Sequence, residues 1–228
     1  MQYGLCNLSI VALRNEPADQ SELTSQVLYG EWFKVLERRK KWSRIRLSYD
    51  GYEGWIDNKQ FRLIEQEEYT NYTSKKEQLC SDLVSFINDD EQKLQPIVMG
   101  SVLNAQPLLN HSFDGEVLMG QKQKSKLIET ALLYLNTPYL WGGKTPFGID
   151  CSGFTQMVYR LNGELLSILR RTNRRCSCYP NHIDPEPLRL PQIVMDCLNG
   201  SLHGFRLQSS CRHCTLTQTD CSPIRMYA

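Results

Sequence analysis

The sequence predicts an α+β protein in which one or two small β-barrels precede a C-terminal region that begins with two helices. Three observations support this fold class. Short apolar runs separated by turn residues fill residues 1–64, as in compact barrels. Two amphipathic helical patterns follow at residues 126–136 and 151–161. A Pro/Gly-rich loop at residues 137–149 joins these two patterns and leads to a cysteine.

The composition of the chain gives no support for a nucleic-acid or membrane partner. The 228 residues allow one large domain or two to three small ones, and a hydrophobic content of 41% is enough for real cores. A net charge of +1 gives no argument for nucleic acid or an anionic membrane surface. The N-terminus lacks a basic and apolar leader, and no apolar run approaches a membrane span. We therefore expect a soluble, cytoplasmic monomer with neither a nucleic-acid nor a membrane partner.

Residues 1–64 form the first predicted domain, a small all-β barrel. Leu8, Ile10 and Ala12 alternate with Ser9 and Val11, as in a half-buried strand. Further short strands are expected at residues 27–29, 33–36, 42–47 and 54–56, with turns around Gly30 and Gly51. The three tryptophans of this region are expected to contribute to its core: Trp32, Trp42 and Trp55.

The next segment, residues 65–120, is less regular. Residues 65–88 have helical punctuation, with Ser74 as a candidate cap and an apolar face built from Leu79, Leu83, Phe86 and Ile87. A strand is expected at residues 96–103 and a turn at 113–116. Residues 126–136 then form an amphipathic helix, which Pro138 ends. Its expected apolar side consists of Leu127, Ile128, Ala131, Leu132 and Leu135.

Cys151 lies where the Pro/Gly-rich loop gives way to the second helical pattern. The i, i+3, i+4, i+7 spacing after it predicts one buried helix face made of Phe154, Met157, Val158 and Leu161. Asp150 is placed as the N-cap of that helix. The positive end of the helix dipole favours a thiolate, which is the nucleophilic form of cysteine. The alternative is a buried structural cysteine, which would be inert.

These residues resemble the signature of the NlpC/P60 cysteine peptidases, in which a Tyr-x-Trp-Gly-Gly loop leads to Asp-Cys-Ser-Gly at the head of a helix. The resemblance covers residues 138–163. Residues 1–64 resemble the bacterial SH3 domain that precedes the catalytic domain in dipeptidyl-peptidase VI-like members, through residues 21–23, 26–31 and 50–56. The resemblance implies a second SH3-like or linker module at 65–120. It also implies the first half of a papain-like NlpC/P60 domain at 121–163.

The same resemblance implies an activity and a set of site residues. Cys151 would be the nucleophile, and Tyr139 would lie close to it and polarise the site. The substrate would be a murein peptide, cut at the γ-D-Glu–diamino acid bond through a thioester, with no cofactor and no metal. Its free N-terminal L-Ala amine would be held by Glu16, Tyr52, Asp150 and Ser152. Two alternatives remain open: an amidase or acyltransferase on the same scaffold, and a non-catalytic module that binds cell-wall peptides.

The tail, residues 164–228, differs in composition from the rest of the chain. All 11 lysines lie at or before Lys144, whereas six of the nine cysteines lie in the tail. The family's Pro-Gly-Asp loop and His-Val-Gly-Ile strand are both missing, so the C-terminal sheet is expected to be missing or irregular. We hypothesise a frameshift near Gly163. A zinc site at the Cys-x-x-Cys of residues 211–214 is a weaker alternative, because one such pair is not enough for a tetrahedral site.

The predicted site also needs a catalytic base. The candidates are His111, His182, His203 and His213, because histidine is the commonest general base. His203 and His213 come nearest to the family's spacing, and His203 is the residue we predict. Without the family's sheet we expect low peptidase turnover, and we expect the helix that begins at Cys151 to lack a packing partner.

Overall fold

The structure, a computed structural model, describes residues 1–123 and 126–164. The predictions made for the tail lie outside the described residues. They include the histidines His182, His203 and His213, the cysteine pair considered for zinc, and the hypothesis of a frameshift.

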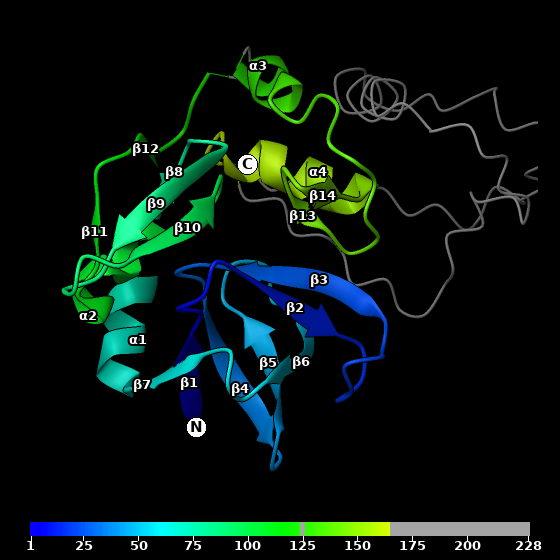
Figure 1. Cartoon of the computed structure of the whole chain (residues 1–228), viewed down its shortest axis with the longest axis vertical. Coiled ribbons are helices and arrows are strands. Elements are labelled where there is room, and N and C mark those ends of the chain that lie inside the picture. The colour runs from blue at the N-terminus through cyan, green and yellow to red at the C-terminus, as the bar shows by residue number, and fades with distance from the viewer. Residues whose placement is uncertain (124–125, 165–228) are drawn as a thin grey trace, which may run out of the picture.

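The N-terminal part is an antiparallel barrel-like sheet of seven strands in the order β3-β2-β6-β5-β4-β1-β7 (Figure 1). The five strands predicted within residues 1–64 are all found, and the two strands there that the sequence did not indicate, β1 and β7, pair with each other. The strands are β1 (Gln2–Leu5), β2 (Ile10–Arg14), β3 (Leu23–Leu28), β4 (Trp32–Arg38), β5 (Trp42–Leu47), β6 (Glu53–Asp57) and β7 (Arg62–Ile64).

The barrel buries apolar side chains on both faces of its sheet. Val11 and Leu13 of β2 point into the barrel core, while Ile10 packs against a second cluster on the outside. Leu8 is exposed, so the predicted alternation had the wrong phase for the barrel core. A strand that packs on both faces carries apolar residues at both parities, and period-2 reading then cannot choose between them. Trp32 belongs to the outer cluster, and Trp42 is only half-buried.

The middle region combines short helices and strands beside the barrel. Its elements are α1 (Gln66–Thr73), β8 (Gln78–Cys80), β9 (Val84–Asn88), β10 (Leu94–Val98), a 3₁₀ turn (Leu103–Ala105), α2 (Gln106–Leu109), β11 (Ser112–Phe113) and β12 (Val117–Met119). The predicted helix over 65–88 is therefore wrong beyond residue 73. Ser74 is the C-cap of α1. The apolar residues after it are spaced like a helix face, but they lie in and between the two strands β8 and β9. Of these, Ile87 is buried and Phe86 is exposed, as alternation in β9 requires.

The last described part contains α3 (Lys126–Leu132), β13 (Lys144–Thr145), β14 (Gly148–Ile149) and α4 (Cys151–Arg160). The predicted helix over 126–136 ends earlier than expected, and its apolar side is only partly covered. Leu127 and Ala131 are buried, whereas Ile128, Leu132 and Leu135 are exposed. Within the described residues, no helix is long and apolar enough to cross a membrane.

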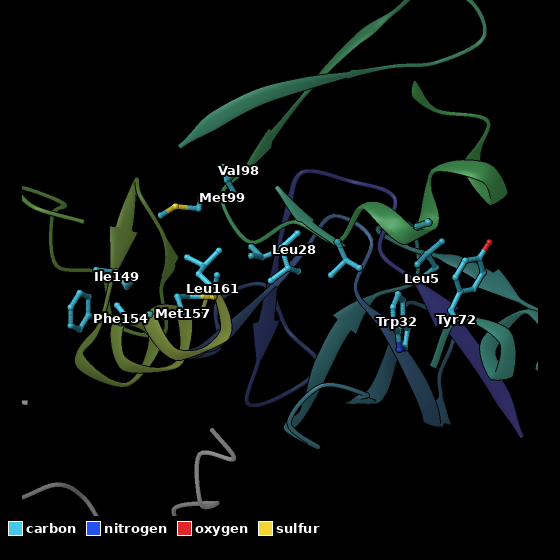
Figure 2. Close-up of a cluster of buried hydrophobic side chains, with 14 of the residues drawn as sticks. Leu5, Leu28, Trp32, Tyr72, Val98, Met99, Ile149, Phe154, Met157 and Leu161 are labelled. Atoms are coloured by element: carbon cyan, nitrogen blue, oxygen red, sulfur yellow. The ribbon is translucent and has the colours of Figure 1, made fainter. Parts of the chain in front are cut away.

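Helix α4 is packed into a core that it shares with the barrel and the middle region. Figure 2 shows Phe154 and Met157 of α4, and Leu161 at its C-cap, in one cluster with Leu28 and Trp32 of the barrel. All four predicted apolar positions of α4 are buried, with at most 3% of any side chain exposed. The expectation that this face lacks a packing partner is therefore wrong. The outer face of the barrel and the segment around Met99 provide one.

Candidate active site

Cys151 is the first residue of α4, and it is exposed to solvent. Asp150 caps the helix as predicted: its Oδ1 accepts a hydrogen bond of 2.6 Å from the backbone N–H of Gly153. The other two described cysteines, Cys6 and Cys80, are buried, and burial raises their pKa values to about 12 and about 11. Cys151 is therefore the described thiol that a substrate can reach, at the positive end of a helix dipole.

The Pro/Gly-rich loop at residues 137–149, called the glycine loop below, is hydrogen-bonded to the residue that caps α4. The second oxygen of Asp150, Oδ2, accepts a hydrogen bond of 2.9 Å from the N–H of Gly142. The N–H of Asp150 donates in return to the carbonyl of Gly143 at 3.2 Å, and the hydroxyl of Ser152 donates to Asp150 Oδ1 at 2.6 Å. A Cβ on Gly153 would lie 2.1 Å from the Gly143 carbonyl oxygen. The tight approach between loop and helix explains the need for glycine there.

Tyr139 lies beside the segment that leads to the nucleophile. It forms an isolated parallel bridge with Ile149, and the N–H of Ile149 donates to the carbonyl of Pro138 at 3.1 Å. Its side chain is 40% exposed. The structure thus places Tyr139 next to the turn that enters α4, and its polarising role stays a prediction.

The barrel approaches the loop before α4, residues 137–149, along β3 (Figure 1). The indole N–H of Trp141 donates to Glu22 Oε1 at 2.8 Å, and the N–H of Lys144 donates to the Gln26 side chain at 2.7 Å. A Cβ on Gly142, whose φ is +73°, would lie 2.5 Å from the carbonyl of Leu23. One edge of the site is therefore closed by the barrel, in direct contact with the loop.

Tyr52 lies among acidic side chains at this junction. Burial raises the pKa of its hydroxyl, and the negative charges of Asp50, Asp150 and Glu22 raise it further. The Tyr52 hydroxyl donates to the carbonyl of Thr24 at 3.4 Å. The negative charge of three carboxylates acting on the Tyr52 hydroxyl favours a cationic ligand such as an ammonium group. The structure thus brings together three of the four predicted amine-binding residues: Tyr52, Asp150 and Ser152.

Glu16 is the exception among those four. It lies exposed in the turn between β2 and β3, where its backbone bonds with Ser21, and it forms no ion pair with any described residue. Glu22, six residues later, reaches the loop instead through Trp141. Sequence reasoning missed Glu22 and Asp50, although both lie within the stretches that carried the SH3 resemblance.

His111 is the one candidate base within the described residues, and it is engaged elsewhere. Its Nδ1 lies 2.9 Å from the hydroxyl of Tyr29, and the two rings stack with centroids 5.8 Å apart. Burial lowers the pKa of its imidazole. It lies between α2 and β11, on the opposite side of Figure 1 from the hairpin of β13 and β14 that leads into α4. No group of side chains with metal-binding geometry occurs in the described part of the chain.

Comparison with known families matches two segments. Residues 13–61 match the bacterial dipeptidyl-peptidase Sh3 domain, and residues 136–195 match the NlpC/P60 family. The second match extends beyond residue 163, where we placed the boundary of the tail. That boundary, like the other domain limits, stays a prediction.

Curated proteins similar to the chain include a dipeptidyl-peptidase 6 from Lysinibacillus sphaericus. It is 28% identical over 182 residues, and the match covers 66% of this chain and 66% of that protein. A gamma-D-glutamyl-L-lysine dipeptidyl-peptidase from Bacillus cereus (strain ATCC 10987 / NRS 248) is 25% identical over 63% of this chain and 51% of its own length. A gamma-D-glutamyl-L-lysine dipeptidyl-peptidase from Bacillus subtilis (strain 168) is 27% identical over 62% of this chain and 54% of its own length. The chain thus spans about half to two thirds of the length of these relatives.

Solved structures share the fold. An NlpC/P60 family protein from Bacillus cereus ATCC 10987 superposes with a TM-score of 0.59 at 19% identity, over 71% of this chain and 72% of that one. An NlpC/P60 endopeptidase from Photobacterium damselae subsp. piscicida gives 0.53 at 14% identity, over 72% and 44%. Together with the two family matches, these superpositions confirm the predicted fold class, an SH3-like β domain followed by an NlpC/P60 domain.

Proposed function

We propose that this chain, which carries a bacterial dipeptidyl-peptidase SH3 domain and an NlpC/P60 cysteine peptidase domain, acts on peptides derived from peptidoglycan. The proposed reaction is hydrolysis of the γ-D-Glu–diamino acid bond in stem peptides that begin with a free L-Ala. The names of the curated relatives support this class of substrate.

One observation carries the proposal: the residue that caps the helix of Cys151 also belongs to the acidic group around Tyr52. Asp150 binds the first turn of α4 through Oδ1, and its charge raises the pKa of Tyr52 on the barrel. An ammonium group held by these carboxylates would therefore lie close to the nucleophile. A pocket of that kind fixes the distance between the free amine of a peptide and the bond that is cut.

The chemistry assigned to the described residues is acyl transfer. The thiolate of Cys151 attacks the γ-carbonyl carbon of D-Glu, forms a thioester and expels the amine of the diamino acid, which takes up a proton. Water then attacks the thioester, and its proton returns to the thiol when the carboxylate product leaves. The start of α4 supplies backbone N–H groups and dipole charge near the sulfur, which stabilise negative charge there.

The proposal places the catalytic base in the tail, outside the described residues. His203 is the candidate that the spacing favours. His182 is the histidine that falls within the matched range 136–195. Because the tail lacks the family's strand phrases, we expect turnover to be low. Loss of a general base typically reduces the rate by about 10²–10⁴-fold.

The test is turnover of L-Ala-γ-D-Glu-L-Lys by the purified full chain, followed by release of free lysine. We expect slow release that Cys151→Ala abolishes, and no release from the same peptide acetylated on its L-Ala nitrogen. His203→Ala and His182→Ala identify the base, because only one of them should reduce the rate. Binding of the peptide without lysine release would refute the peptidase assignment and favour a binding module. Equal cleavage of the acetylated peptide would refute recognition of the amine.

A further inference from the structure

Glu31, Lys144, Arg160 and Glu77 form a charged cluster in the interior, apart from the residues assigned to substrate. Lys144, Arg160 and Glu31 have exposed fractions of 2%, 3% and 4%. The four members come from four places in the chain. Glu31 lies in the turn before β4, Lys144 in β13, Arg160 at the end of α4 and Glu77 just before β8. Charged groups this deeply buried are rare unless they are paired.

Arg160 and Glu31 are the centre of the cluster. The Nη1 of Arg160 bonds Glu31 Oε1, while its Nε and Nη2 bond the two oxygens of Glu77 at 3.2 Å and 3.0 Å. The guanidinium also lies over the ring of Tyr49, at 4.1 Å from the ring centroid. The second oxygen of Glu31 accepts the N–H of Leu28 at 2.8 Å. Every nitrogen of Arg160 is therefore bonded, and this half of the cluster is complete without Lys144.

Lys144 makes a different kind of contact. Its Nζ lies 3.6 Å from Glu31 Oε1, and it has no hydrogen-bond acceptor among the described residues. A buried ammonium without hydrogen bonds is costly, so its retention calls for a role that packing alone does not supply. Its backbone forms β13, where Lys144 pairs with Ile149 of β14, two residues before Cys151.

The same carboxylate oxygen thus contacts both flanks of the nucleophile. Lys144 precedes Cys151 by seven residues, and Arg160 follows it by nine. Glu31 is fixed in turn by the barrel backbone. The hairpin before α4 and the end of α4 are therefore tied to one point of the barrel.

We propose that Lys144 is a positioning residue: its ion pair with Glu31 holds the hairpin of β13 and β14, and through it the peptide from Ile149 to Cys151, in place. Describing Cys151 as the nucleophile rests on the proposed function, but the placement of its backbone does not. Lys144 itself is too deeply buried to touch a substrate.

The test replaces Lys144 in the full chain and measures backbone exchange. Lys144→Met removes the charge and keeps the length of the side chain, while Arg160 stays paired with Glu31 and Glu77. Lys144→Arg keeps the charge. Lys93→Met is the matched control, because Lys93 and Glu91 form an ion pair in which both side chains are 71% exposed. Hydrogen–deuterium exchange of each variant is followed by mass spectrometry, together with the pH profile of Cys151 alkylation by iodoacetamide.

We expect Lys144→Met to accelerate exchange by about tenfold or more in peptides covering residues 138–150, with little change in peptides covering β5. The apparent pKa of Cys151 should rise, and Lys144→Arg should restore both properties. Lys93→Met should change neither.

Three results would overturn the inference. Equal acceleration throughout the chain would show that Lys144 serves global stability only. A shifted alkylation profile with unchanged exchange would show an effect of charge rather than of position. Failure of Lys144→Arg to restore either property would show that the ion pair is not the cause. None of these measurements requires turnover, so an inactive chain would refute the proposed peptidase function and leave this inference standing.

Discussion

Replacing Gly153 by alanine tests how closely the glycine loop approaches α4. Alanine is the better helix former by about 1 kcal/mol, so helix propensity alone predicts stabilisation. The structure predicts the opposite sign. The added Cβ would lie 2.1 Å from the carbonyl oxygen of Gly143, whereas carbon–oxygen contacts in proteins normally begin at about 3.3 Å. The loop and the helix would have to separate by about 1 Å.

The loop cannot yield without loss, because two hydrogen bonds tie it to the helix cap. They join Gly142 N–H to Asp150 Oδ2 and Asp150 N–H to the Gly143 carbonyl, and each contributes about 1 kcal/mol. Overpacking of a well-packed site costs a further ~1–3 kcal/mol. After subtraction of the helix-propensity gain, we expect a net destabilisation of about 1–3 kcal/mol.

The assay is urea unfolding followed by tryptophan fluorescence, with Thr155→Ala as the control. Thr155 lies in the same helix and donates to the carbonyl of Cys151 at 2.9 Å, so its replacement raises helix propensity without a clash. We expect that control to remain within about 0.5 kcal/mol of the parent. A Gly153→Ala variant as stable as the parent, or more stable, would refute the close contact of loop and helix.

Three further outcomes follow from the same site. At neutral pH, iodoacetamide should label Cys151 well before Cys6 and Cys80, because burial raises their pKa values to about 12 and about 11; peptide mapping that finds a buried thiol labelled first would contradict this. In Asp150→Asn the side-chain oxygen can still cap α4, but the new NH₂ group replaces Oδ2 and cannot accept the hydrogen bond from the Gly142 N–H. This substitution should lower the free energy of unfolding by about 1–2 kcal/mol, and an unchanged urea midpoint would count against the second oxygen's role. Burial raises the pKa of Glu31, but the neighbouring cations Lys144 and Arg160 outweigh it and hold that pKa below the usual range of a glutamate. The stabilisation by Glu31 is thus fully present above the pKa of an unfolded glutamate and is lost as the pH falls through the lowered pKa of the folded state. Glu31→Gln should flatten the acid side of the melting-temperature profile, and parallel profiles would argue against the buried pair.

The start of α4 could be predicted from the sequence because its signals are local. A capping aspartate, a helical apolar spacing and glycines before them all lie within about 25 residues, and each acts on its neighbours. The structure confirms the cap, the helix and the burial of its apolar face.

The helix predicted after α1 was wrong because the signals that decide this region are not local. Leu79, Leu83 and Ile87 are spaced like a helix face, but they belong to two strands and the turn between them. Leu83 is exposed, while Leu79 and Ile87 are buried in different clusters. Short apolar runs fit both periods, and only the partners of β8 and β9 decide between them. Those partners lie elsewhere in the chain, in β10, β11 and β12.

The contacts between the barrel and the loop before α4 are encoded by no local sequence pattern. Trp141 reaches Glu22 across 119 residues of sequence, and Gln156 donates to Asp50 across 106. Resemblance to the family pointed to Glu16, whose role stays a prediction, whereas the contact between the barrel and the loop is made by Glu22. A loop residue can match a motif and still face solvent, because side-chain direction in a turn depends on the packing around it.

The barrel and the helix that begins at Cys151 share one hydrophobic core and should be treated as one unit. The outer face of the barrel is buried at one end by α1, where Tyr69 stacks on Tyr3 with ring centroids 4.2 Å apart, and at the other end by α4. Leu28 and Trp32 belong to the same cluster as Phe154 (Figure 2). An inserted charge or a cavity in that cluster would therefore disturb the helix that carries Cys151 and the strand β3 that closes the site, although the two are separated by more than 100 residues of sequence. Packing across this core sets the distance between the acidic group around Tyr52 and the Cys151 sulfur, and the proposed function requires that distance to match the one between the free amine of a peptide and the bond that is cut.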